Sequence, residues 1–126
     1  MKIKEFDPVI YPIKIWVCIG YDIKELRKKF IQNDDIELQE VEDFNAYTQP
    51  VKRKKDNKLG IIIVFENYDY MSVEIISHEA SHAAKIIFEH IDADMRPHEP
   101  FEYLLSWIAK CCEEVKVKQR LINNNK

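Results

Sequence analysis

Residues 59–91 read LGIIIVFENYDYMSVEIISHEASHAAKIIFEHI, and this stretch contains the strongest structural signals in the chain. Its first eight residues, Leu59 to Glu66, are almost all apolar and rich in β-branched side chains, which is typical of a buried strand. After a short polar turn the apolar residues recur at helical spacing, and Ser72 can cap a helix that runs to about Ile91. A strand followed directly by a long amphipathic helix is therefore predicted.

The flanking sequence adds further strands and helices. Strands are predicted over 11–19 and 44–51, where β-branched and aromatic residues are frequent. A short helix is predicted over 22–30 behind an aspartate in the N-cap position, and Pro100 is well placed to open a second long helix. The order β-α-β-β-α-α predicts one α+β domain spanning 1–126, with a sheet of about three strands packed against two long helices.

Composition narrows the possible functions. A chain of 126 residues that is 46% hydrophobic can bury a core without the help of metal or disulfides. The net charge of -3 argues against nucleic acid as the main partner, and two glycines are too few for a glycine-rich phosphate loop. We expect neither a secretory signal nor a membrane span. The odd number of cysteines, two of them adjacent, favours free thiols and a cytoplasmic location.

The predicted helix contains His78-Glu79-Ala80-Ser81-His82, an H-E-x-x-H motif. Residues four apart lie on one face of a helix, so both imidazoles can bind one zinc ion while Glu79 lies beside a water on that ion. Zinc lowers the pKa of its water to about 7, and Glu79 can then act as the general base that passes the proton to a leaving amine. The alternative is a pair of solvated surface histidines and a glutamate in ordinary ion pairs.

A catalytic zinc site needs a third protein ligand. The downstream candidates are His90, Asp92, Asp94, His98, Glu99 and Glu102. The first two follow the motif too soon to fold back onto it. Pro100 favours an extended conformation for Glu99 at the mouth of the last helix, whereas Glu102 falls where a glutamate commonly caps backbone N–H groups. Glu99 is therefore the preferred third ligand and Glu102 its competitor.

Two segments of this region resemble a known family. The runs HEASHAAKIIFEHI and DMRPHEPFEYLLSWI look like small zinc-peptidase-like proteins from phages and gut bacteria, as do YPIKIWVCIG and KLGIIIVFENYDYMS earlier in the chain. The resemblance covers most of the chain, but only H-E-x-x-H and E-P-x-x-Y-L are specific. It implies a minimal zincin-like fold of the gluzincin type, with Zn2+ bound by His78, His82 and Glu99 and with Glu79 as general base. Position 102 is usually a small residue in that family, so Glu102 is a departure.

These observations predict a zinc-dependent metallopeptidase-like protein that acts on a peptide or protein. One alternative is a non-enzymatic protein-binding module that keeps the scaffold, with structural or vestigial metal. Another is a nucleic-acid accessory factor that uses the basic run 52–58, which is more typical of a solvated hairpin tip. Tyr103, one turn beyond Glu99, is either a donor to a developing oxyanion or a helix-packing residue. The sequence leaves the oligomeric state open.

Overall fold

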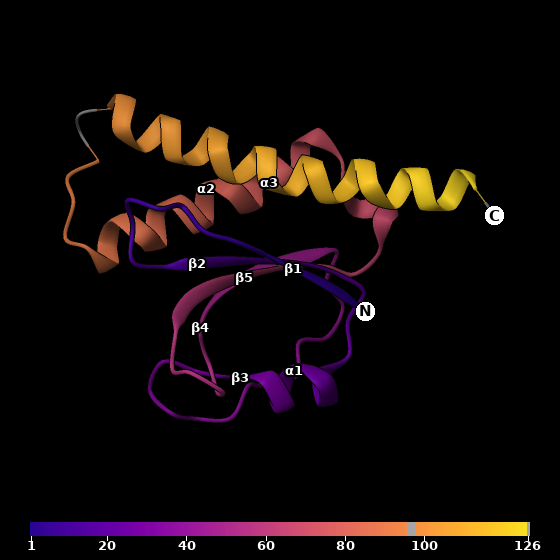
Figure 1. The fold of residues 1–126 in the computed structure, drawn as a ribbon, viewed down its shortest axis with the longest axis horizontal. Helices are drawn as coiled ribbons and strands as arrows, with labels where there is room; N and C mark the ends of the chain where they lie inside the picture. Colours follow the sequence, from indigo (N-terminus) through magenta and orange to yellow (C-terminus); the bar gives the residue numbers. More distant parts are fainter. Residues whose placement is uncertain (96–97, 126) are drawn as a thin grey trace.

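The computed structural model describes residues 1–95 and 98–125, apart from the side chain of His98. In these residues the chain is an α+β protein with a five-stranded mixed sheet (Figure 1). Its strands are β1 (Lys2–Phe6), β2 (Lys14–Ile19), β3 (Phe30–Ile31), β4 (Ala46–Arg53) and β5 (Leu59–Phe65). Its helices are α1 (Ile23–Lys29), α2 (Val73–His90) and α3 (His98–Asn124), with a 3-10 turn at Tyr68–Tyr70.

The α+β class is confirmed, and the sheet of about three strands is wrong. The two additional strands are β1 and β3, which the local sequence pattern does not predict. β1 reads KIKEF, so most of its residues are charged, and it is held in place as an edge strand by antiparallel pairing with β2. β3 has two residues and follows α1 without a break, pairing only with Lys52 and Arg53. Both strands depend on a neighbouring strand rather than on their own propensity.

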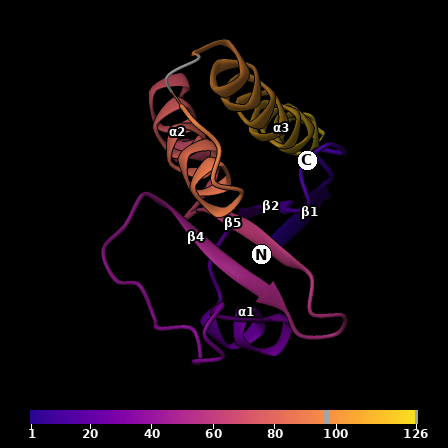
Figure 2. The same cartoon turned by 90° about the vertical axis from the view of Figure 1, so that its left-hand side faces the viewer.

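The sheet has the order β1-β2-β5-β4-β3, in which only β2 and β5 are parallel. α2 and α3 cover one face of this curled sheet and α1 lies against the other (Figures 1 and 2). Because both faces are covered, β5 is apolar in both directions. Ile61, Ile63 and Phe65 belong to the core under α2 and α3, whereas Ile62 and Val64 belong to the core around Trp16 and α1.

β4, unlike β5, has a side that is largely free of strand partners. Beyond β5, its other neighbour is β3, which pairs only with Lys52 and Arg53. Within the described residues, 46–51 therefore have no strand partner on their outer side. Pro50 suits this position. A central strand donates N–H groups to neighbours on both sides, and proline has no N–H to donate.

The predicted helix starts are confirmed for α1 and α2. An Asp22 carboxylate oxygen accepts hydrogen bonds from the N–H groups of Lys24 and Glu25, at 3.1 and 3.3 Å. Ser72 Oγ accepts from the N–H of Ile75 at 3.1 Å. Among the residues that the structure describes, no helix has both the length and the apolar character needed to span a membrane.

Candidate metal centre

The two motif histidines lie together on the exposed side of α2. The Nε2 atoms of His78 and His82 are 3.0 Å apart, and the rings meet edge to face with centroids 4.6 Å apart. Two zinc–nitrogen bonds of about 2.0–2.1 Å at a tetrahedral angle would separate the nitrogens by roughly 3.3 Å. The pair therefore fits a shared metal ion after opening by a few tenths of an ångström. It also fits an N–H···N hydrogen bond between two neutral rings.

Glu79 faces the protein rather than the solvent. It is 6% exposed and is the only buried charged side chain in the described part of the chain. The hydroxyl of Thr48 donates to Glu79 Oε1 at 2.8 Å and lies 3.3 Å from the backbone carbonyl of the same residue. This contact joins α2 to β4. Successive residues differ by about 100° around a helix, so the Glu79 side chain points toward the sheet while its neighbour His78 is exposed.

The structure does not bring Glu99 to the motif. α3 begins at His98, two residues before the predicted start at Pro100, so Glu99 is helical rather than extended, and its side chain is exposed. The ring of Phe101 packs against Phe88 with centroids 5.5 Å apart, which holds the first turn of α3 beside the last turns of α2. Glu99 therefore lies at the opposite end of α2 from His78.

An electrostatic interaction further along α3 indicates the scale of this separation. Burial raises the pKa of the Cys112 thiol, and the nearby Cys111 and Glu79 raise it further, so Cys112 lies within electrostatic range of the motif. About 20 Å of helix, at about 1.5 Å per residue, separates Glu99 from Cys112. Glu102 is also exposed, and it lies only one helical turn nearer to the motif than Glu99 does. No three His, Cys, Asp or Glu side chains in the described ranges are grouped to hold a metal ion.

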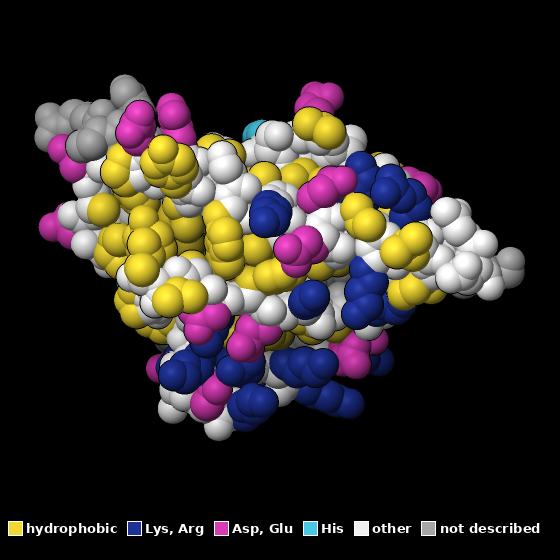
Figure 3. All heavy atoms as spheres, turned by 45° about the horizontal axis from the view of Figure 1, so that its top comes forward, with side chains coloured by type: hydrophobic (Ala, Val, Ile, Leu, Met, Phe, Trp, Pro, Cys, Tyr) yellow, Lys and Arg dark blue, Asp and Glu magenta, His cyan; other side chains and the backbone are white. Residues whose placement is uncertain are grey.

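His90, Asp92 and Asp94 lie away from the pair as well. His90 is the exposed last residue of α2, and Asp92 and Asp94 are exposed in the following loop, while the side chain of His98 lies outside the described residues. Tyr103 is 72% exposed and lines an apolar pocket of about 480 Å³ with Ile10 and Trp107. Hydrophobic side chains gather near this end of α3 (Figure 3).

In comparisons with protein-family models, curated proteins and solved structures, nothing matches this chain. The resemblance drawn from the motifs therefore stays a prediction. Sequence reasoning missed Thr48, the partner of Glu79. Its only signal is that it lies in a predicted strand, and strand periodicity cannot say which helix residue a threonine will meet.

Proposed function

We propose that this chain is a zinc-dependent, metallopeptidase-like hydrolase of peptides or proteins, in which His78 and His82 bind the metal and Glu79 is the general base. The observation that supports it best is the convergence of the two Nε2 atoms at 3.0 Å, with Glu79 next to the first histidine. Imidazole nitrogens are common zinc ligands. When bound, zinc would supply an activated water and polarise the scissile carbonyl.

The chain's own residues have defined tasks in this proposal. The hydroxyl of Thr48 holds the Glu79 carboxylate in one orientation where α2 packs against β4. The unpaired outer side of β4, residues 46–51, would accept an extended peptide as an added strand. The predicted third ligands, Glu99 and Glu102, lie far from the histidine pair in this structure, so only His78 and His82 are assigned as metal ligands. Free, buried cysteines agree with the proposed cytoplasmic location.

The test is metal content of the purified chain by elemental analysis, combined with a peptide-library cleavage screen. We expect about one zinc per chain in the native protein and loss of zinc in His78→Ala. His90→Ala is the matched control, because it removes another exposed histidine from the same helix and should leave the zinc content unchanged. Glu79→Gln should keep the zinc and lose cleavage. Native protein without zinc, or equal zinc content in His78→Ala, would rule out the site.

A second candidate is a protein-binding module without catalysis. It is favoured by the structural role of Glu79, whose buried, hydrogen-bonded carboxylate ties α2 to β4. In that case the protein binds zinc, cleaves no peptide in the screen, and binds its protein partner equally well as native protein and as Glu79→Gln. Chelator-sensitive cleavage that Glu79→Gln abolishes would exclude this candidate.

A further inference from the structure

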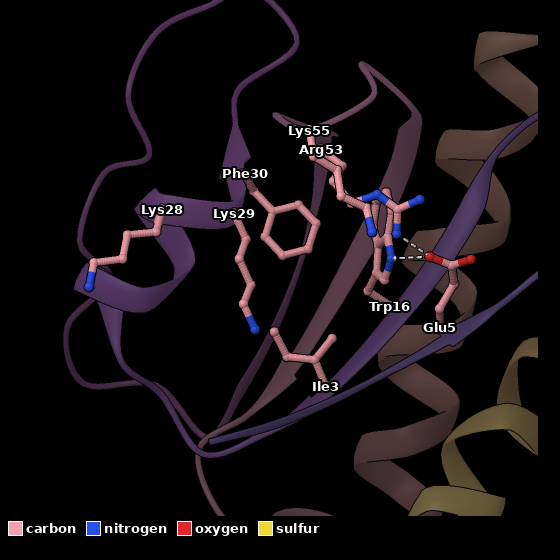
Figure 4. A pocket seen from close by; sticks show the side chains of 8 residues that line it. All are labelled: Ile3, Glu5, Trp16, Lys28, Lys29, Phe30, Arg53 and Lys55. Carbon is pink, nitrogen blue, oxygen red and sulfur yellow. Dashed lines mark hydrogen bonds and ion pairs between the residues drawn. The ribbon is translucent and has the colours of Figure 1, made fainter.

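A second cavity lies on the face of the sheet that α1 covers (Figure 4). The helix α2, which carries the histidine pair, lies on the opposite face (Figure 2). The cavity has a volume of about 360 Å³, is open to solvent on one side, and is lined by residues of β1, β2, the end of α1 and the β4–β5 hairpin. This volume is at the lower end of the range for small-molecule sites, about 300–1,000 Å³. The cavity is therefore large enough for a small organic ligand and too small for a folded partner.

The floor of the cavity is apolar and held rigidly. Trp16 and Phe30 are each 2% exposed, with ring centroids 4.9 Å apart. The indole N–H of Trp16 donates to Glu5 at 3.0 Å, and the guanidinium of Arg53 donates to the same carboxylate oxygen while lying 5.4 Å from the indole ring. Figure 4 shows these three side chains joined at one end of the cavity. A ligand would meet a preformed surface that costs little to order.

The rim is cationic, although the Asp56 carboxylate interacts with Lys55 through space. Lys28 and Lys29 come from the last turn of α1, and Lys55 comes from the hairpin. Within the described ranges, none of these three ammonium groups has an ion-pair partner. Other cations nearby do have one, because Lys52 pairs with Asp35 and Arg53 pairs with Glu5 and Asp56. In a chain of net charge -3, this is a local excess of positive charge beside an apolar floor.

Figure 4 shows how the lysines lie. Lys29 extends past Phe30 toward Ile3, whereas Lys28 points away from the other labelled side chains. An anionic group near the ammonium of Lys29 would thus be next to apolar contacts from Ile3 and Phe30. Ammonium groups bind phosphate as point charges, and a phosphate monoester carries a charge of about -1.5 to -2 at neutral pH.

We propose that this cavity binds a small phosphate monoester with an apolar or aromatic body, the phosphate on Lys29 and Lys55 and the body against Ile3 and Phe30. A nucleic-acid strand fits less well, because it needs a long basic groove that holds several nucleotides, and this cavity has a volume of only about 360 Å³. The site shares no residue with the His78–His82 pair, so it stands whether or not the chain is a hydrolase.

The test is a titration of the full chain with phenyl phosphate, followed by NMR at the indole N–H of Trp16. We expect saturable shifts, at least tenfold weaker binding of inorganic phosphate, and at least tenfold weaker binding of phenyl phosphate by Lys29→Gln and by Lys55→Gln. Lys24→Gln is the matched control, because Lys24 is an exposed lysine of the same helix that does not line the cavity. It should bind phenyl phosphate as the native chain does.

Three outcomes would overturn the proposal. One is the absence of saturable shifts at Trp16 with phenyl phosphate. Another is an equal loss of affinity in Lys24→Gln and Lys29→Gln, which would indicate general charge attraction. The third is tighter binding of a single-stranded oligonucleotide than of phenyl phosphate with the same dependence on Lys29, which would make the cavity part of a nucleic-acid surface.

Discussion

At the scale of single residues, the Thr48–Glu79 pair is the contact most closely linked to the proposed site. A buried carboxylate is costly unless it is hydrogen-bonded, and the Thr48 hydroxyl provides that bond from the neighbouring strand. The same side chain therefore has a structural role and a proposed catalytic role. Substitutions can separate the two, because an amide keeps the hydrogen-bond acceptor but cannot act as a base at neutral pH.

We expect Glu79→Gln to change the free energy of unfolding by less than about 1 kcal/mol, because the amide oxygen still accepts from Thr48. Thr48→Val leaves the buried carboxylate without that donor and should cost about 1–3 kcal/mol. Urea denaturation measures both values, and Thr48→Ser, which keeps the hydroxyl, is the control. No loss of stability in Thr48→Val would show that the hydrogen bond contributes nothing.

Gly60 is a second residue whose identity the packing requires. A Cβ atom at this position would lie 2.1 Å from the ring of Trp16 and 2.7 Å from the carbonyl oxygen of Lys14. Gly60→Ala should therefore destabilise the protein by about 1–3 kcal/mol, as overpacked core substitutions do. Thermal unfolding would show this as a lower midpoint.

A double-mutant comparison identifies the cause. In a Trp16→Leu background most of the ring is absent, so Gly60→Ala should cost clearly less there than in the native chain. Additive effects of the two substitutions would mean that Trp16 is not what excludes a side chain at position 60.

At the scale of elements, the sequence itself fixes where α2 begins, and packing against the rest of the protein holds the remainder of the helix in place. Ser72 supplies the cap, and the buried residues of the helix follow at helical spacing. The exposed side, which carries both motif histidines, contributes nothing to that packing. The helix can therefore keep its position whether or not the histidines bind metal.

We expect Ser72→Ala to destabilise the protein by about 1 kcal/mol, because the N–H of Ile75 loses its side-chain acceptor. Ser81→Ala is the control from the exposed side of the same helix. Alanine has the higher helix propensity, so Ser81→Ala should be neutral or slightly stabilising. Urea titration of both variants tests this, and a similar loss of stability in both would remove the capping explanation.

At the scale of the whole molecule, one ion pair links distant parts of the curled sheet. Arg53, at the end of β4, donates to Glu5 on β1, although β2 and β5 lie between these strands in the sheet order. Arg53 also binds Asp56 in the hairpin at 2.8 Å. These ion pairs, together with the core around Trp16, therefore hold the strands together on the side of the sheet that faces α1.

This ion pair predicts an acid-sensitive contribution to stability. Burial raises the pKa of Glu5, but hydrogen bonds from Trp16 and Arg53 outweigh it and lower the pKa below its ordinary value. The hydrogen bond from Arg53 lowers the pKa of Asp56 to about 2. Because both folded-state pKa values are depressed, the stabilisation is complete above the unfolded pKa values of about 4 and is lost as the pH falls toward 2.

Arg53→Met should therefore lower the free energy of unfolding at pH 6, and the gap from the native protein should narrow markedly at pH 2.5. Urea titrations of both proteins at the two pH values measure this difference in the free energy of unfolding. Lys54→Met is the control, because Lys54 is its exposed neighbour and has no ion-pair partner within the described residues. A gap of equal size at both pH values would contradict the prediction.

Much of the fold follows from local sequence. The cores of β2, β4 and β5, the caps at Asp22 and Ser72 and the helical pairing of the motif histidines all depend on residues close together in the chain. Pro50 also carried a usable signal, since proline within a strand indicates an edge. β1 and β3 were missed because pairing with a neighbouring strand creates them.

Sequence alone was enough to specify an α+β chain with a buried strand leading into an amphipathic H-E-x-x-H helix, because propensity, capping and periodicity act over a few residues. Only the tertiary structure decided that Glu79 meets Thr48, that Glu99 lies far from His78, and that unpaired lysines surround a cavity beside Trp16. These relations depend on how α3 lies along α2 and how the sheet curls. Both are set by the packing of side chains distant in sequence, which no local pattern encodes.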